Sequence, residues 1–169
     1  MKKPIVSVVM GSDSDLPVMK SCAEMLEFFK IPFEMTVISA HRAPEKTNLY
    51  AKNLTKNGIQ VVIAGAGGAA HLPASVASLT TIPVIGIPIK TETLSGVDSL
   101  YSIVQMPKGV PVATVSINGS ANAAILACEI LSLNNTHLKK KLNQYKKDLE
   151  KNVLKKDVKL KKVGYRRYI

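Results

Sequence analysis

The feature that most constrains the fold is the stretch from Val61 to Pro73, which reads VVIAGAGGAAHLP. Apolar, partly β-branched residues stop at three glycines within four positions, and small residues that suit a helix follow. This order predicts a buried strand, a loop with almost no side chains, and the start of a helix. Such a loop lets a ligand approach backbone N–H groups, and a helix N-terminus behind it favours negative charge. A tight strand-to-helix turn without a ligand explains the stretch equally well.

The glycine spacing also fits a second, looser pattern. Gly65-x-Gly67-x-x-Ala70 matches a loose dinucleotide-binding fingerprint. That fingerprint normally follows the first strand, with an acidic residue closing the second, so the match is weak. A flavin- or nucleotide-binding module therefore stays open as an alternative.

Strand and helix patterns alternate five times along the chain. We predict strands over residues 4–10, 33–38, 60–64, 83–87 and 112–117, and helices over about 15–31, 44–57, 70–79, 97–104 and 121–133. Continuously apolar strands between helices are typical of an α/β protein, here a three-layer α/β/α sandwich around a parallel five-stranded sheet. We assign 1–135 to this domain, 136–153 to a charged C-terminal helix that packs on the body or a neighbouring subunit, and 154–169 to a basic tail.

Polar loops follow the first three strands. In an open parallel sheet, ligands bind outside the carboxyl ends of the strands, so these loops emerge at one edge. Arg42 offers a planar fork that suits phosphate or carboxylate. Ser12 and the glycine N–H groups are expected to complete an anion nest, with Ser14 among the other polar groups of these loops. Asp15 either accepts hydrogen bonds from sugar hydroxyls or caps the following helix, and both roles are compatible.

Two histidines stand in the same loops. His41 is the candidate for proton transfer, because histidines ordinarily ionise near neutral pH and this one adjoins an arginine on the binding edge. His71 is a second possibility, or it only bonds the backbone at the helix start. Ser39 lines the pocket or bonds its own loop. The residues themselves therefore predict a sugar-phosphate ligand with proton-transfer chemistry.

The basic charge of the chain is concentrated at its C-terminus. Residues 139–169 hold 13 of the 23 Lys and Arg residues and 3 of the 12 Asp and Glu residues, a net charge of +10. Residues 1–138 hold the other 10 and 9, a net charge of +1. Such a run is most often a solvated helix face or tail. Non-specific attraction to nucleic acid is the alternative, but no base-reading motif accompanies it, so we expect no specific nucleic-acid partner.

Other features point to a cytoplasmic protein without a membrane partner. No apolar run approaches the roughly 20 residues that a membrane helix needs. The apolar run near the N-terminus is too short for a signal peptide, and polar residues follow it directly. Cys22 and Cys128 show no metal-binding spacing and are expected to be buried thiols.

Four separated motifs together resemble one family. They are Gly11-Ser12-x-Ser14-Asp15, Ser39-Ala40-His41-Arg42, the 64–73 stretch AGAGGAAHLP, and the 95–107 stretch SGVDSLYSIVQMP. In this order they resemble class I PurE, the N5-carboxyaminoimidazole ribonucleotide (N5-CAIR) mutase of bacterial purine biosynthesis. The resemblance covers about residues 4–150 and leaves out the tail beyond about Val153.

This resemblance implies a flavodoxin-like fold and a homo-octamer with active sites near subunit boundaries. The implied reaction is an isomerisation that moves a carboxylate from N5 to C4, giving 4-carboxy-5-aminoimidazole ribonucleotide (CAIR) without metal or organic cofactor. His41 is implied as the proton shuttle. The residues implied to bind the ribose phosphate are Ser12, Asp15 and Arg42, with Ser39 beside them. The residues implied to surround the base and the transferring CO2 are Ala66, Gly67, Gly68, His71 and Leu72.

Two points qualify the resemblance. The family usually has glycine after His-Leu-Pro, where this chain has Ala74. We expect this position to be helical, in which case alanine is harmless. The runner-up within enzymes is a class II relative that carboxylates aminoimidazole ribonucleotide (AIR) with CO2 directly, although the Gly-Gly-Ala-Ala-His-Leu-Pro loop favours class I.

Overall fold

The computed structural model describes residues 3–168, and its centre is a five-stranded sheet in which all neighbouring strands are parallel. The strands are β1 (Val6–Met10), β2 (Phe33–Val37), β3 (Val61–Gly67), β4 (Val84–Ile89) and β5 (Ala113–Thr114). Their order across the sheet is β2-β1-β3-β4-β5. This is the flavodoxin-like order of a doubly wound sheet, so the predicted fold class is confirmed.

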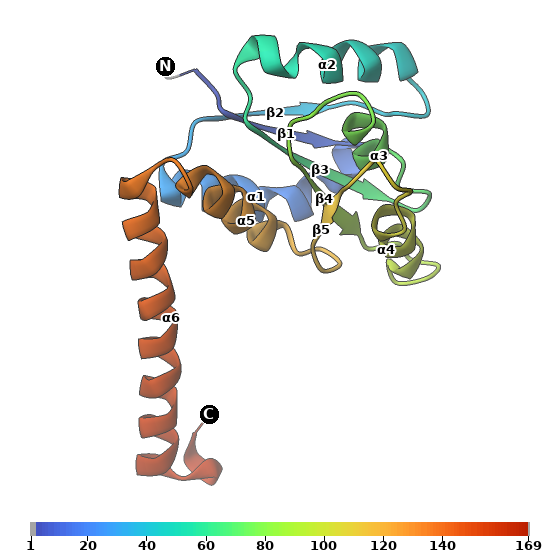
Figure 1. The fold of residues 1–169 in the computed structure, drawn as a ribbon. Helices are drawn as coiled ribbons and strands as arrows, with labels where there is room; N and C mark the ends of the chain where they lie inside the picture. The colour runs from blue at the N-terminus through green and yellow to red at the C-terminus, as the bar shows by residue number, and fades with distance from the viewer. Residues whose placement is uncertain (1–2, 169) are drawn as a thin grey trace. The chain divides into compact units, whose positions relative to one another are not determined.

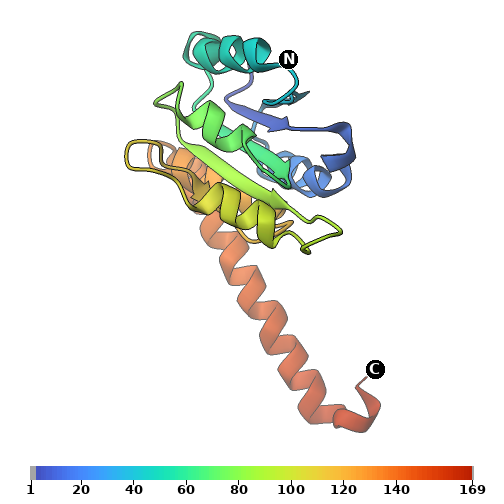
Figure 2. The same ribbon diagram turned by 90° about the vertical axis from the view of Figure 1, so that its right-hand side faces the viewer.

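Helices cover both faces of this sheet (Figures 1 and 2). α1 and α5 lie on one face, and α2, α3 and α4 lie on the other. Their bounds are α1 (Leu16–Phe29), α2 (Pro44–Asn57), α3 (Leu72–Ala77), α4 (Val97–Val104) and α5 (Ser120–Ser132), with a 3-10 turn, η1 (Asp13–Asp15), before α1. Buried strand residues such as Val9 and Val62 join Leu54, Val76 and Ile103 from the helices in one apolar cluster. This burial is the main stabilising term of the fold.

The strands differ from the predicted ones near the glycine-rich stretch. β3 continues to Gly67 instead of ending at Ala64, because Gly65 and Gly67 pair with Ile87 and Ile89 of β4. Glycine has a low strand propensity, so the hydrogen bonds to the neighbouring strand are what extends β3 through these positions. β5 has only two residues where we predicted six, and α3 spans six residues where we predicted ten. Ala74 lies inside α3, so its predicted helical placement is confirmed, while its harmlessness stays a prediction.

The chain divides into two compact units between Leu131 and Ser132. The second unit contains α6 (Thr136–Val163) and a final 3-10 turn, η2 (Tyr165–Arg167). α6 begins where the Asn135 side chain accepts a hydrogen bond from the Leu138 N–H (3.0 Å). It ends ten residues beyond the predicted Val153, because Lys and Leu are good helix formers even without a core to pack on.

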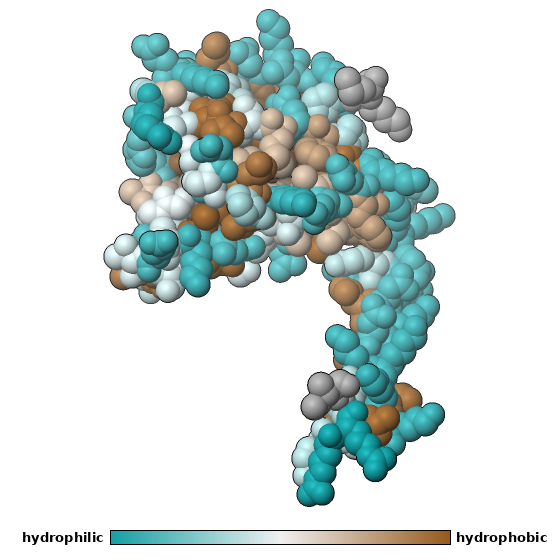
Figure 3. Space-filling model, turned by 180° about the vertical axis from the view of Figure 1, so that it is seen from behind, coloured by the Kyte–Doolittle hydropathy of each residue, from teal (hydrophilic) through white to brown (hydrophobic). Residues whose placement is uncertain are grey.

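The side chains of α6 are mainly hydrophilic on the face that Figure 3 shows. Across residues 3–168, none of the helices combines the length and the hydropathy that a bilayer crossing requires. The packing of this helix on the body or a neighbouring subunit stays a prediction, and so does the assignment of residues 154–169 to a separate basic tail.

Candidate active site

The end of β1 holds a carboxylate in a fixed position. Ser12 precedes η1, its Oγ accepts a hydrogen bond from the Ser14 N–H (3.3 Å), and its own N–H donates to the Asp15 carboxylate (3.0 Å). This reciprocal pair is a capping box. Asp15 is buried, and this burial raises the pKa of its carboxyl, while the hydrogen bond from Ser12 opposes the rise. Asp15 therefore caps η1 and borders the cavity at once, whereas it makes no side-chain cap to α1.

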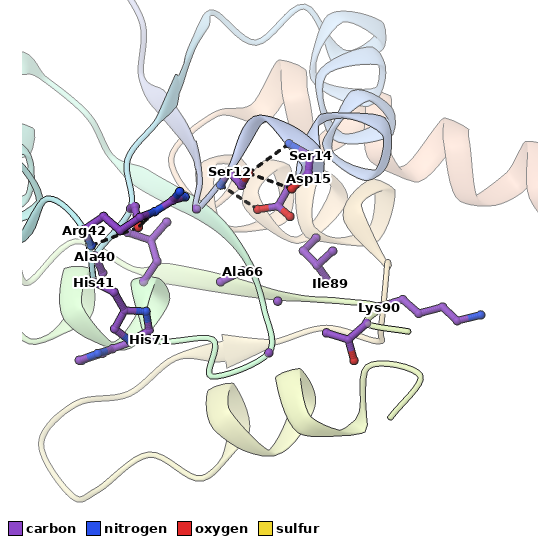
Figure 4. Close-up of a pocket in the computed structure, with 16 residues that line it drawn as sticks. Ser12, Ser14, Asp15, Ala40, His41, Arg42, Ala66, His71, Ile89 and Lys90 are labelled. Carbon is purple, nitrogen blue, oxygen red and sulfur yellow. Dashed lines mark hydrogen bonds between the residues drawn. The ribbon is translucent and has the colours of Figure 1, made fainter. Parts of the chain in front are cut away.

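The end of β2 forms a turn that carries the arginine. The Ser39 Oγ accepts hydrogen bonds from both the backbone N–H (3.3 Å) and the Nε (3.2 Å) of Arg42. The Ser39 carbonyl accepts a further one from the Ala43 N–H (2.8 Å). Ser39 thereby fulfils both predicted roles, since it bonds its loop and lines the cavity. Figure 4 shows the guanidinium of Arg42 directed toward the loop that carries Ser12.

The end of β3 brings the second histidine beside the first. Gly68 has φ +66°, a left-handed conformation that favours glycine, and its carbonyl accepts from the Ala70 N–H (2.8 Å). His71 follows and precedes α3. The imidazole rings of His41 and His71 lie 5.2 Å apart, centroid to centroid, and are tilted by 57°. Both rings therefore occupy the same end of the site (Figure 4).

The predicted nest of glycine N–H donors is wrong in part. The N–H of Gly68 donates to the Ser99 Oγ (2.8 Å), and that of Gly11 donates to the Gly65 carbonyl (3.1 Å). The Ser12 N–H is bound by Asp15. These backbone donors already serve the fold, because buried N–H groups must be paired internally. An anion at this edge would therefore be bound mainly by side chains, above all that of Arg42, and this binding role stays a prediction.

One cavity of about 610 Å³ collects every site residue that the sequence predicted. Its volume suits a small-molecule ligand. The ten predicted residues that line it are Ser12, Asp15, Ser39, His41, Arg42, Ala66, Gly67, Gly68, His71 and Leu72, together with Ser14. The convergence of the three loops is thereby confirmed, while the catalytic and binding roles assigned to individual residues stay predictions.

Sequence reasoning missed one wall of the cavity. Ile89, Lys90 and Thr91 at the end of β4 also line it. The same rule that placed the first three loops could have found them, because β4 neighbours β3 and ends at the same edge. Figure 4 shows the Lys90 side chain on the side of the cavity away from the two histidines. The side chain of Thr91 donates a hydrogen bond to Asp98 (2.8 Å).

The described part of the chain, residues 3–168, contains no group of three or more His, Cys, Asp and Glu side chains arranged to hold a metal ion. The expectation that no organic cofactor takes part stays a prediction. Cys22 and Cys128 are both buried in the interior, away from the cavity lining, and burial raises the pKa of Cys22 to about 12.

Comparisons with known proteins agree on one family. Residues 5–152 match a family model described as AIR carboxylase. The N5-carboxyaminoimidazole ribonucleotide mutase of Thermotoga maritima is 56% identical over 166 residues, which cover 98% of this chain and 97% of that protein. That of Pyrococcus horikoshii is 55% identical over 168 residues, covering 99% and 95%.

A longer relative and a solved structure complete the comparison. The phosphoribosylaminoimidazole carboxylase of Candida glabrata is 56% identical over 169 residues, which are 100% of this chain but only 30% of that protein. The crystal structure of PurE from Treponema denticola matches with a TM-score of 0.86 at 28% sequence identity, covering 94% of this chain and 99% of the other.

Proposed function

The chain belongs to the AIR carboxylase family, and from this premise we propose that it is an N5-CAIR mutase, an isomerase that forms CAIR in purine biosynthesis. Two relatives of matching length bear the mutase name. The carboxylase name belongs to a protein of which this chain spans about 30%. The observation that carries the proposal is the single cavity that joins two imidazoles at one end to Arg42, Ser12 and Asp15.

The polar cluster would bind the ribose phosphate. The Arg42 side chain supplies charge and a planar fork for the phosphate oxygens, and Ser39 already holds its Nε in place (3.2 Å). Ser12 adds a hydroxyl, and the carboxylate of Asp15 would accept a hydrogen bond from a ribose hydroxyl. These contacts would place the aminoimidazole ring toward the small residues Ala66, Gly67 and Gly68, with His71 and Leu72 completing its surroundings.

The imidazole of His41 would then move the proton. The bond between N5 and the carboxylate carbon breaks, CO2 forms, and His41 donates a proton to N5, which gives AIR. C4 attacks the CO2, and the new carbon–carbon bond leaves one proton too many on C4. His41 removes that proton, which restores the aromatic ring and returns the histidine to its starting state. A wall of glycine and alanine suits this chemistry because CO2 must stay beside C4 until it is attacked.

Assembly and location are part of the same proposal. α6 exposes apolar side chains that a single chain leaves in water, including Leu149, Val153 and Leu160. A neighbouring subunit would cover them in a homo-octamer with active sites near subunit boundaries. A phosphorylated nucleotide does not cross membranes unaided, which fits a cytoplasmic enzyme. Mass measurement of the native protein in solution tests the octamer.

The reaction is tested with substrate carrying ¹³C in its N5 carboxylate. In unlabelled bicarbonate, a mutase transfers the labelled carbon, so we expect ¹³C in most of the CAIR formed. The control reaction supplies AIR with labelled bicarbonate. CAIR formation from AIR and bicarbonate, with no response to N5-CAIR, would instead identify a direct carboxylase and overturn the proposal.

A further inference from the structure

A buried hydroxyl of α4 joins two walls of the cavity. The Ser99 Oγ accepts a hydrogen bond from the Gly68 N–H (2.8 Å) and donates one to the Ile89 carbonyl (2.6 Å). Gly68 belongs to the segment that follows β3, and Ile89 ends β4. Both residues line the cavity, whereas Ser99 is fully buried and does not. Ser99 can therefore act on a ligand only through the two walls that it connects.

Two neighbours of Ser99 contact the same walls. The Ser102 hydroxyl has two acceptors within hydrogen-bond distance, the Asp98 carbonyl at 2.8 Å and the Gly68 carbonyl at 3.3 Å. The Asp98 carboxylate accepts a hydrogen bond from the Thr91 hydroxyl (2.8 Å). Within one turn of helix, α4 thus contacts the N–H and the carbonyl of Gly68 and the side chain of Thr91.

Gly68 depends on such contacts for its position. Gly68 has a φ of +66°, but glycine adopts positive and negative φ values about equally well. The intrinsic preference of the residue therefore does not select this conformation. A Cβ built on Gly68 would meet no atom within 4 Å, so no packing holds it on that side. The Ala70 N–H holds the Gly68 carbonyl, the hydrogen bonds to α4 hold both its N–H and its carbonyl, and the loss of Ser99 would leave the Gly68 N–H without its acceptor.

We propose that Ser99 is a positioning residue for the carboxylate transfer, since it fixes Gly68, the first residue beyond the paired ends of β3 and β4, against Ile89 beside the reacting atoms. The inference rests on the proposed function. A wall displaced by about 1 Å lets CO2 drift from C4, and misplacement on that scale lowers rates on the order of 100-fold. The ribose-phosphate contacts lie on other loops, so substrate binding should change less than turnover.

Ser99→Ala tests the inference, with Ser120→Ala as the matched control. Ser120 is also buried, and its hydroxyl donates to the Val18 carbonyl (2.6 Å) outside the cavity, so both variants lose a buried serine–backbone contact. We expect Ser99→Ala to lower kcat about 10- to 100-fold with KM within about threefold. Ser120→Ala should leave both constants within about twofold of the wild type.

Hydrogen exchange supplies a readout that needs no substrate. In Ser99→Ala, amide exchange of a peptide covering residues 66–71 should accelerate at least about tenfold, because the Gly68 N–H loses its acceptor. The same peptide should be unchanged in Ser120→Ala. Ser102→Ala serves as a second variant if Ser99→Ala does not fold, and it should shift exchange and kcat in the same direction by about threefold.

The outcomes separate this inference from the proposed function. If the wild type converts N5-CAIR and Ser99→Ala keeps its kcat or its exchange rate, the positioning role is overturned and the function stands. Equal losses in Ser99→Ala and Ser120→Ala would also overturn it, because they would reflect general destabilisation. A wild type without turnover overturns the proposed function, and the positioning role with it.

Discussion

The two units of the chain distribute charge and apolar surface in opposite ways. Residues 1–131 carry a net charge of +1 and residues 132–169 a net charge of +10. The first unit buries every residue of its strands β1 and β4 and all of β3 except Gly67, whereas α6 exposes Leu149, Val153, Leu154 and Val158. Every residue that lines the cavity comes from positions 11–91. The comparison teaches that the cavity and the buried sheet belong to the first unit, whereas most side chains of the second unit are exposed.

The largest expected effect is a loss of turnover when His41 of the first unit is replaced, compared with a replacement of His137 in the second unit. His41→Asn removes the proposed proton shuttle, so we expect turnover of N5-CAIR to fall on the order of 1,000-fold with nucleotide binding retained. His137→Asn, in α6, is the matched control and should leave the rate unchanged. Steady-state kinetics and calorimetric titration with CAIR measure both. A near-normal rate for His41→Asn would remove the shuttle role.

Arginines offer the next contrast. Arg42→Ala deletes the charge-assisted contact proposed for the phosphate, and we expect affinity for CAIR to fall about 10- to 100-fold. Arg166→Ala removes an exposed arginine of the second unit and should change affinity by less than about twofold. Titration at two salt concentrations separates a direct contact from general attraction. Equal affinity losses in the two variants would contradict the assignment.

Packing differs between the units as strongly as chemistry. A Cβ at Gly65 would lie 2.5 Å from the buried Met19 sulfur, so Gly65→Ala should lower the free energy of unfolding by about 1–3 kcal/mol. Asn152→Ala, on exposed α6, should change it by less than about 0.5 kcal/mol. Urea unfolding measures both. A Gly65→Ala variant as stable as the wild type would show that the Met19 side chain can shift away from the added methyl group without cost.

The smallest expected effect is a change in the pH dependence of stability when Asp15 is replaced, with Asp157 as the comparison. Burial raises the pKa of Asp15 above 3.8, so protonation favours the folded chain. The stability that this group contributes is present below pH 3.8 and is lost as pH rises through the folded pKa. Asp15→Asn keeps an oxygen acceptor for the Ser12 N–H and cannot ionise. Its stability relative to the wild type should therefore rise between pH 3.8 and the pKa of Asp15 in the folded chain, and then level off at higher pH.

Asp157→Asn is the control for this pH series. Asp157 is exposed on α6 and pairs with Lys161 (2.7 Å), a surface contact of small energetic weight. Its stability relative to the wild type should not follow the Asp15→Asn profile between about pH 4 and pH 7. Urea unfolding across this range gives the difference. A flat profile for Asp15→Asn would show that the carboxyl is not penalised by burial.

The sequence predicted the elements best where the signal is local. α2 begins at Pro44 and ends at Asn57 as expected, because a proline starts it and Gly58 stops it. α4 also matches its predicted bounds. The strand ends were less predictable, because β3 continues through Gly65 and Gly67 only by pairing with β4. α6 is longer than predicted because its residues favour a helix even where they do not contribute to a core.

By itself, the sequence determined the order of strands and helices, the family, and the three loops that meet at the carboxyl edge of the sheet. These follow from apolar periodicity, from local turn chemistry and from motifs in order. Only the tertiary structure decided that Gly68 and Gly11 donate their N–H groups inward, that Ile89–Thr91 form a further wall, and that Ser99 ties two walls together. Hydrogen-bond partners between residues 31 positions apart depend on how the strands and helices pack, and no local pattern records that packing.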